Sequence, residues 1–467
     1  MLWIKTRTMG EYEKMKEIKI LTPVGMLGYG FPEEHFTAGM ERNPDAVILD
    51  SGSTDPGPYM LGANTTLVKP RAYERDLTVI LKGIGEKKIP LLIGSAGGAG
   101  TRSNVDYITD LIGQICGKLG LHKKVVKIYA DIDKETVKEK YEQGKIASCS
   151  SSPEATMQDI EDSVRIVAQM GKEPILKALQ ENPDADIVVA GRAYDPAPYA
   201  AYCEYKGITD PGIYWHMGKI MECGAFCCEK KGQVILATVR EDSFDLEPMD
   251  PDNRCTTVTV AAHTLYEKTR PDLLPGPGGV LNLQGSHYKQ LTGRSVRVGG
   301  SAFEPAEKYT VKLEAAASCG YRCTFIGGVR DPILIACLDK LLPLVHKYVE
   351  NLYPELASGV AKLVFHQYGR NAVMEELEPN PAYLPQEIGI LGEVTAPTQE
   401  LANAICSNAR VAVLHGPYPG QLATGGNLAL PLNPPDNALG EVFRFSLYHT
   451  MEVDDPVSMF PIEVLEV

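Results

Sequence analysis

Short runs of apolar residues alternate with longer segments of helical periodicity from Met15 to about Gly207. The short runs have the length and composition of buried β-strands, and between them leucine, isoleucine and valine recur at spacings of three and four residues, as in amphipathic helices. This alternation predicts an open, doubly wound, mostly parallel α/β sheet. The predicted strands are residues 18–23, 46–51, 89–95, 124–131 and 186–192, and the main helical segments are residues 71–86, 104–119 and 154–181.

The alternation of short apolar runs and helical segments ends near residue 208, and a new series of strands and helices begins near residue 308. The middle segment contains two stretches that we expect to be strands, QVILATVRED and TTVTVAAHTLYE, and a Pro/Gly-rich stretch at residues 274–285. From residue 308 onward, strand, helix, strand and again strand, helix, strand are predicted, which is typical of a split βαβ module. Those strands lie near 309–326 and at 361–369, with a long helix at 332–351 and a further strand and helix after residue 388.

A chain of 467 residues is long enough for about three domains of roughly 150 residues each. We expect residues 1–14 to be a disordered extension, because MKEIKILTP, from Met15, runs directly into the first strand. Residues 15–300 are then the main α/β domain with the active site, and residues 301–467 a smaller α+β domain.

Composition and charge narrow the class of protein. The chain is 44% hydrophobic and 23% charged, has no run of eighteen apolar residues, and carries a net charge of −14. We therefore expect neither a membrane span nor a nucleic acid partner, since phosphates are repelled by this charge. The eleven cysteines are scattered without a secretory leader, which is typical of reduced thiols in the cytoplasm. Large cytosolic enzymes are commonly symmetric homo-oligomers.

One strand-to-loop junction occurs twice. NPDAVILDSGSTDPGPY begins at Asn43 and NPDADIVVAGRAYDPAPY at Asn182, so that Asp55 and Asp195 occupy matching Asp-Pro positions. If both strands are parallel, their loops leave the same edge of the sheet, and the two carboxylates can face one crevice. The alternative is ordinary turn chemistry, in which each aspartate caps its own loop.

Two carboxylates held close together do not both ionise freely, so one becomes an acid and the other a base at neutral pH. Such a pair suits proton transfer, or the addition or removal of water, beside a carboxylate or thioester. The alternative is that the same oxygens bind Mg²⁺. An acid/base pair alone needs no cofactor. Substrate-binding candidates in these loops are Ser53, Thr54, Arg192 and Tyr194. The Arg192 guanidinium could grip a substrate carboxylate or form an ordinary salt bridge.

The stretch GSAGGAGTRSN, Gly94 to Asn104, follows a predicted strand and opens a helix. Bare backbone amides and a helix N-terminus can hold an anion such as a carboxylate or an acyl-CoA phosphate. The candidates are Gly97, Gly98, Gly100, Thr101 and Arg102. A capping box formed by Ser103 and Asp106 is the structural alternative.

A second glycine stretch, GMLGYGF, follows the first strand, and Asp50 ends the next. Gly25, Gly28, Gly30 and Asp50 could form a nicotinamide site, although Glu33 stands where the third glycine of the fingerprint belongs.

In HMGKIMECGAFCCEK, helical spacing places His216, Lys219 and Cys223 on one face. His216 and Lys219 are candidates for substrate binding, and Glu222 and Cys223 for catalysis. A metal site is less favoured, because Cys223 and Cys227 lack a second pair of ligands, and a structural packing motif is the remaining alternative. His263, in VAAHTLYE, is expected to be satisfied within a strand.

Several stretches together resemble the acyclic terpene utilisation (AtuA-like) family, a domain of unknown function: MKEIKILTPVGMLGYGFPEEHF, LDSGSTDPGPYMLG, GSAGGAGT, VVAGRAYDPAPY, HMGKIMECGA, LPGPGGVLNL and the C-terminal FRFSLYH, VDDP and FPIEV. The resemblance runs from Met15 to Val467 and implies a role in the breakdown of terpenoids and other carboxylic acids, beside acyl-CoA enzymes and a small companion protein. It assigns no reaction to any residue.

Residues and resemblance together predict a cytosolic catabolic enzyme, a lyase (hydratase or dehydratase) or an isomerase, acting on a small carboxylic acid or acyl-CoA thioester through Asp55 and Asp195. The alternatives are a nicotinamide-dependent oxidoreductase and a non-catalytic subunit that needs a partner chain.

Overall fold

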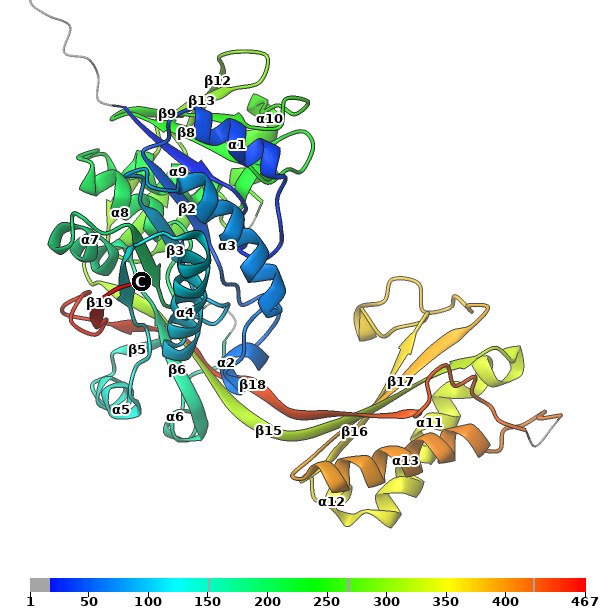
Figure 1. Cartoon of the computed structure of the whole chain (residues 1–467). Coiled ribbons are helices and arrows are strands. Elements are labelled where there is room, and N and C mark those ends of the chain that lie inside the picture. The colour runs from blue at the N-terminus through cyan, green and yellow to red at the C-terminus, as the bar shows by residue number, and fades with distance from the viewer. Residues whose placement is uncertain (1–16, 150–151, 267–268, 423–424) are drawn as a thin grey trace, which may run out of the picture. The chain divides into compact units, whose positions relative to one another are not determined.

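The computed structural model describes residues 17–149, 152–266, 269–422 and 425–467 (Figure 1). These residues form two compact units, one of residues up to Ala316 together with Phe445–Val467, and one of Ala317–Arg444. The units divide the chain at other points than the predicted boundary at residue 300. The predicted extension, residues 1–14, lies outside the described residues.

The first unit is built on a large mixed sheet, and the five strands predicted from the N-terminal pattern are all present. They form its parallel centre, in the order β1 (Ile18–Thr22), β2 (Ala46–Asp50), β3 (Leu91–Gly94), β7 (Ile187–Ala190) and β4 (Lys124–Ile128). Antiparallel strands extend both edges: β19 (Ile462–Glu466) beside β4, and β8 (Ile235–Val239), β9 (Ser243–Pro248), β13 (Val296–Gly299) and β12 (His287–Gln290) beyond β1.

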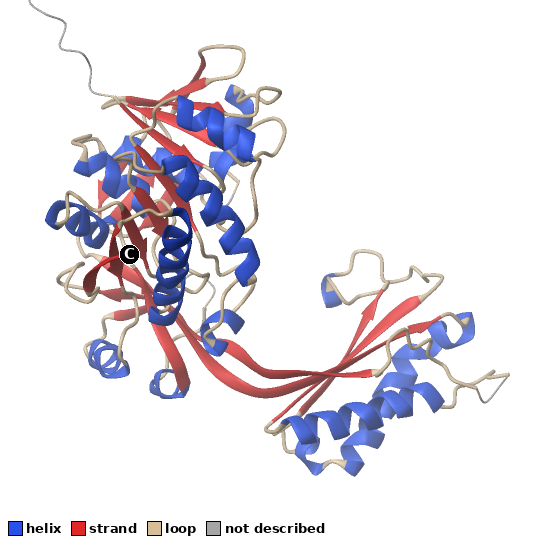
Figure 2. Ribbon diagram, viewed as in Figure 1, coloured by secondary structure: helices blue, strands red, loops and turns tan. Residues whose placement is uncertain are grey.

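Helices cover both faces of this sheet, as the α/β prediction requires (Figure 2). Alternate residues of each parallel strand enter different cores: Ile20 and Ile48 belong to one, Leu21 and Leu49 to the other. Because both faces are buried, these strands appear in the sequence as continuous apolar runs. One core contains α1 (Glu33–Glu41), α3 (Pro70–Ile84) and α4 (Arg102–Leu119); the other contains α7 (Lys172–Glu181), α8 (Ala197–Tyr205) and α9 (Pro211–Met221).

Two predicted elements are wrong. Residues 154–181 are not one helix but α6 (Met157–Asp162), β6 (Ser163–Gln169) and α7, because β6 pairs with the long strand β15 (Thr310–Val329). The stretch TTVTVAAHTLYE is not a strand but contains α10 (Thr257–Thr264), so His263 lies on a helix. A capping box between Thr256 and Thr259 satisfies the first amides of α10 and outweighs the β-propensity of threonine and valine.

Smaller elements complete the first unit. A three-stranded antiparallel sheet has the order β10 (Leu273–Gly276), β11 (Gly279–Asn282) and β14 (Ala302–Pro305). The remaining elements are α2 (Tyr59–Ala63), α5 (Lys134–Glu142), β5 (Ile146–Ser148) and the 3-10 helix η1 (Gly224–Cys227).

The second unit follows the predicted strand–helix–strand pattern, repeated once. Its strands pair in the order β16 (Lys362–Tyr368), β17 (Ile388–Ala396), β15 and β18 (Asp436–Glu452), and β15 and β18 also run on into the first unit. Alternate residues of β17, such as Ile388 and Ile390, pack with α11 (Pro332–Leu352) and α13 (Gln399–His415) in one core. Two short helices, α12 (Pro354–Ala357) and η2 (Glu375–Leu377), lie between these elements. Across the described ranges, no helix is both long and apolar enough to cross a bilayer.

Candidate functional site

Polar and ionisable side chains gather at the carboxyl ends of the parallel strands. Asp50 is the last residue of β2, Ser95 follows β3, and Arg192 and Asp195 follow β7. Ligands of open α/β sheets bind beyond this edge, so the residues that the strands deliver here form the candidate site.

Asp50 is the carboxylate most strongly perturbed by this environment. Its side chain is buried, and within the described part of the chain its Oδ1 atom has no hydrogen-bond partner. Burial raises the pKa of Asp50 well above its usual range, the negative charges of Asp195 and Glu222 raise it further, and Arg192 opposes them. The surroundings therefore favour a protonated, neutral Asp50.

Asp195 supplies the second carboxylate. Its side chain is 32% exposed, and Oδ1 lies 3.6 Å from Nη1 of Arg192. That oxygen is itself buried and, among the residues described, accepts no hydrogen bond. Asp50 and Asp195 thus each keep one buried oxygen unused by the protein, which is the state expected of groups that meet a ligand.

Arg192 is held by the protein rather than left for a substrate. Nε and Nη2 donate to the two oxygens of Glu314 at 2.9 and 3.2 Å, and Nη1 donates to the Ser95 hydroxyl at 3.1 Å. Lys312 Nζ approaches Glu314 at 2.7 Å from the other side. The bidentate geometry supports the salt-bridge alternative for Arg192 and makes it a residue that positions Asp195. The sequence analysis missed Glu314 and Ser95, and a lone glutamate among the apolar residues of β15 was the available signal for the former.

Asp55, the predicted partner of Asp195, lies on an exposed turn outside the buried cluster. The Gly57 amide donates to the Thr54 carbonyl at 2.9 Å, and the Asp55 amide donates to Ser53 Oγ at 3.1 Å. Gly57 adopts φ +82°, so this loop turns before α2 begins at Tyr59. In the second copy the Ala197 amide donates to the Tyr194 carbonyl at 2.6 Å across the matching turn, and α8 begins at Ala197, directly after Asp195 and Pro196. The turn chemistry alternative describes Asp55, and the carboxylate on which the charge of Asp195 acts is Asp50.

The end of α9 contributes to the same cluster. Lys219 and Glu222 are both 6% exposed and joined by a short charge-assisted hydrogen bond. The charge of Glu222 acts on Asp50 and on Tyr199, whose hydroxyl is within 2.9 Å of Thr22 Oγ1. Cys223 follows, half-buried, with its backbone packed against Gly25, where a Cβ would lie 2.7 Å from the Cys223 carbonyl carbon. Lys219 and Glu222 therefore lie beside the acid cluster and pair with each other.

His216 belongs to the core and not to this cluster. It is fully buried, Nδ1 lies 3.1 Å from Ser301 Oγ, and its ring packs edge-on against Phe244. Burial lowers the pKa of His216 to about 3, so the ring is neutral at physiological pH. The geometry gives no support to the predicted role of His216 in substrate binding.

The glycine-rich loop after β3 is a packing element. The amides of Ser95, Ala96, Gly97 and Gly98 all donate to protein acceptors, and the Gly100 carbonyl accepts the Arg192 amide at 3.1 Å. These amides are therefore not available to an anion. The left-handed backbone of Gly97, Gly98 and Gly100 lets the loop lie directly against its neighbours.

The residues that end this loop also have structural partners. Thr101, rather than the predicted Ser103 and Asp106, caps α4, because its side chain accepts the Asn104 amide. The Arg102 guanidinium lies 3.6 Å from the centre of the Tyr129 ring and pairs with Glu463. Neither finding supports the predicted anion site.

The geometry also gives no support to the alternative of a nicotinamide site. The amides of Gly28 and Gly30 donate to one oxygen of Asp76 at 2.8 and 3.0 Å, which occupies the donors that a pyrophosphate would need. Glu33 and Glu34 in the first turn of α1 add negative charge at that helix N-terminus. Asp50 faces the acidic cluster described above.

The sequence left Mg²⁺ binding by the carboxylates open and made a metal site at Cys223 and Cys227 a less favoured alternative. In the described ranges, the group of side chains close enough to share one metal ion is neither of these but Cys227, Cys228 and Cys255.

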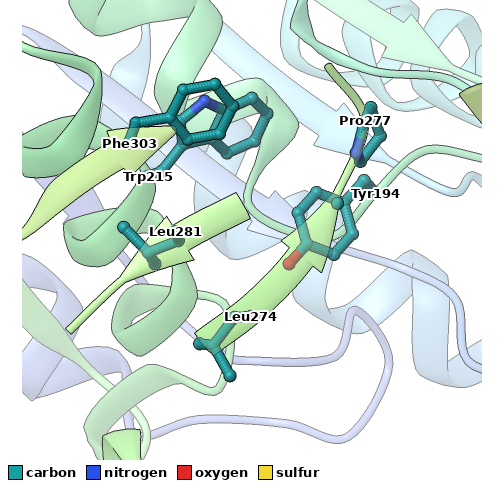
Figure 3. Close-up of a pocket in the computed structure, with 7 residues that line it drawn as sticks. Tyr194, Trp215, Leu274, Pro277, Leu281 and Phe303 are labelled. Atoms are coloured by element: carbon teal, nitrogen blue, oxygen red, sulfur yellow. The ribbon is translucent and has the colours of Figure 1, made fainter. Parts of the chain in front are cut away.

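The structure also contains a pocket lined by aromatic side chains (Figure 3). One of its walls is Tyr194, the residue directly before Asp195 in the chain. The space between its side chains is small and partly open to solvent. The ring centres of Trp215 and Phe303 are 6.2 Å apart and those of Tyr194 and Trp215 are 5.7 Å apart. The other lining residues are Leu274, Gly276, Pro277 and Leu281. Of these residues, the sequence analysis had singled out Tyr194 alone.

The fold and the site define an α/β protein with an unusual group of buried acids at the carboxyl edge of its sheet. Comparison with protein families identifies it further: the model described as "Acyclic terpene utilisation family protein AtuA" matches residues 69–232 and 243–430. The chain therefore belongs to the acyclic terpene utilisation family, which is implicated in a catabolic process. Neither a curated protein nor a solved structure matches it.

Proposed function

We propose that the protein is a cytosolic catabolic enzyme that uses Asp50 and Asp195 as an acid/base pair on a small carboxylic acid or its acyl-CoA thioester. The observation that supports this most is the pair of buried carboxylate oxygens without hydrogen-bond partners, Oδ1 of Asp50 and Oδ1 of Asp195, within the described chain. In this proposal the partner of Asp195 is Asp50 and not the predicted Asp55.

The two carboxylates have different environments, and different environments give different roles. Asp50 is buried and favoured in its protonated form, so it is the proton donor. Asp195 is partly exposed and lies beside Arg192, so it is the base. In a hydration, Asp195 takes a proton from the water whose oxygen adds to a carbon–carbon double bond, and Asp50 delivers its proton to the neighbouring carbon. In an isomerisation, Asp195 removes a proton from the carbon next to the carbonyl and Asp50 protonates the far end of the conjugated system.

Substrate preference follows from the aromatic pocket. Tyr194, Trp215 and Phe303 offer apolar faces, which suit the branched hydrocarbon chain of a terpenoid acid better than a polar substrate. Because Tyr194 is adjacent to Asp195 in the chain, one end of such a ligand could lie near the base while its chain contacts the rings.

A ligand screen followed by variants tests this proposal. Thermal shifts of the purified chain against branched unsaturated acids, their CoA thioesters, nucleotides and divalent metals would identify ligands that favour the native form. For a ligand that is turned over, Asp50→Asn and Asp195→Asn should each reduce kcat by about 10²–10⁴, whereas Asp55→Asn should leave it near normal. Turnover that survives both of the first two changes would remove the pair from the mechanism.

A second candidate is a subunit that acts only with a partner chain. The second unit exposes large apolar side chains, among them Val373 at 81% and Leu377 at 79%, as well as Tyr368 on β16. Exposed apolar groups of this kind mark association surfaces, either between copies of this chain or with a small companion protein. Turnover by the purified chain alone would exclude the need for a partner, and its sedimentation behaviour would give the oligomeric state.

A further inference from the structure

Three cysteine thiols meet at a place that the acid cluster does not use. Cys227 and Cys228 lie at the end of η1, and Cys255 stands two residues before α10. The Cys255 sulfur is 3.4 Å from that of Cys228 and 4.0 Å from that of Cys227, and all three sulfurs lie within 4.8 Å of one another. All three residues are buried.

The two segments that carry these thiols are fixed to each other by backbone contacts. Cys228 and Cys255 are direct partners in an antiparallel bridge, and the Glu229 amide donates to the Arg254 carbonyl at 3.0 Å. The Asn253 side chain accepts the Lys230 amide and donates to the Lys230 carbonyl. The sulfur atoms are thus held in place before any ligand arrives, which reduces the entropy lost on binding.

A partly exposed cation lies near the thiols. The Arg294 guanidinium donates to the carbonyls of Pro248 and Asp250 at 2.6 Å each and to that of Asn253 at 3.0 Å, so its position is fixed. Its fixed positive charge favours the thiolate, which is the form that ligates metals.

We propose that Cys227, Cys228 and Cys255 form a three-thiolate binding site for a soft metal cation, with Zn²⁺ and Cu⁺ as the two candidates of that chemistry. Thiolate ligands select these ions over Mg²⁺ and Ca²⁺. At a metal–sulfur distance of about 2.3 Å, the sulfurs around a tetrahedral ion are about 3.8 Å apart, close to the separations of 3.4 and 4.0 Å seen here. Only small side-chain shifts would be needed.

Charge and proton balance are consistent with such a site. Binding releases one proton for each thiol that is still protonated, so affinity rises with pH. Three thiolates and one Zn²⁺ carry a net charge of −1, and three thiolates and one Cu⁺ carry −2; Arg294 offsets one unit in either case. The three ligands fill the coordination of a trigonal Cu⁺, or leave a fourth position for water on Zn²⁺.

A disulfide between Cys228 and Cys255 is the rival use of the same residues, because partners in an antiparallel bridge can lie at the spacing that a disulfide requires. That reaction needs an oxidant and leaves Cys227 without a role. The closeness of all three sulfurs favours the metal.

The test uses the full-length chain, reduced and kept anaerobic. After addition of Zn²⁺ or of chelator-buffered Cu⁺ and removal of excess ion, elemental analysis should find one metal per chain in one of the two arms. Cd²⁺, as a spectroscopic probe, should produce sulfur-to-metal charge-transfer absorption that saturates at one equivalent. Cys228→Ser should abolish both signals. Cys116→Ser, which alters a buried thiol on α4 outside the cluster, should leave them unchanged.

Three results would overturn the proposal. They are the absence of metal in the reduced wild-type chain, metal content that is unchanged in Cys228→Ser, and a mass of the unreduced chain that is lower by two hydrogens with a Cys228–Cys255 linkage in its peptides. The wild-type measurement stands even if a variant fails to fold.

Discussion

Arg192 and Glu314 join the end of β7 to β15 through two parallel hydrogen bonds of 2.9 and 3.2 Å, and both residues are 3% exposed. A fully desolvated pair of this kind is stable only while both partners are present. It holds the guanidinium at the fixed place from which Arg192 acts on Asp195 and Asp50, so the acid cluster depends on a glutamate that does not itself face it.

Glu314→Gln should therefore destabilise the protein by about 3–5 kcal/mol, the usual cost of leaving one partner of a buried pair unmatched. Urea denaturation of variant and wild type measures the difference. Glu452→Gln is the matched control, because Glu452 pairs with Lys308 at the surface and its loss should change stability little. Equal effects of the two changes would contradict the importance of the buried pair.

Gly100 and Gly120 allow a comparison at nearly identical backbone angles, φ +65° and φ +67°. Alanine at either position should cost about 1–2 kcal/mol, because the left-handed conformation is unfavourable with a Cβ atom. At Gly100 the new Cβ would also overlap the backbone nitrogen of Arg192, whereas at Gly120 it meets nothing. Gly100→Ala should thus cost about 1–3 kcal/mol more, as overpacking does. Similar unfolding midpoints for both variants would show that the loop does not need this close approach.

His216 predicts how the protein responds to acid. Because burial lowers its pKa to about 3, the unfolded chain binds a proton at this residue near pH 6.5 while the folded chain does not. Stability is therefore lost as the pH falls from about 6.5 toward 3, with a slope of up to about 1.4 kcal/mol per pH unit from this one group. His216→Gln should flatten that slope in denaturation curves taken at pH 5, 6 and 7. An unchanged slope would mean that His216 is protonated in the folded state.

Much of the fold could be predicted from the sequence, because the parallel strands are buried on both faces and produce uninterrupted apolar runs. The errors fall where a local signal competes with a distant partner. Residues 163–169 form a strand because β15, about 150 residues later, pairs with them, and no window of local sequence contains that information. At residues 257–264 a local signal decided the structure. The threonine capping box begins a helix there, although the β-branched residues of the segment indicate a strand.

The sequence placed the candidate acids beyond the carboxyl ends of the strands, and we keep Asp195 and replace Asp55 with Asp50. The repeat around Asp55 and Asp195 is present in the sequence, yet Asp55 lies on an exposed turn. Asp50 was noticed only as a possible ribose ligand, because its acidic neighbours, Asp195 and Glu222, come from the loop after β7 and from the end of α9. Glu314 and Cys255 reach their partners over 122 and 28 residues, distances at which a single sequence offers no pattern.

The raised pKa of Asp50 predicts that the stability of the protein decreases as the pH rises. Its pKa is raised in the folded state by burial first and by Asp195 second, so the folded chain retains a proton that the unfolded chain releases. Stability should fall as the pH rises from the ordinary range of an aspartate toward that raised pKa. Asp50→Asn should remove this part of the pH dependence, and Asp195→Asn should reduce it. Denaturation at pH 5 and pH 8 provides the comparison, and an Asp50→Asn chain whose stability changes between these pH values by as much as that of the wild type would argue against a raised pKa.

The central claim is that Asp50 holds a proton at neutral pH beside Asp195. Infrared spectroscopy of the folded chain tests it directly, because a protonated carboxyl has a carbonyl stretch that is separate from carboxylate and amide bands. At pH 7 the wild-type protein should show this band, Asp50→Asn should lack it, and Asp55→Asn should retain it. A wild-type spectrum without the band at pH 7, or one in which the band survives in Asp50→Asn, would contradict the account.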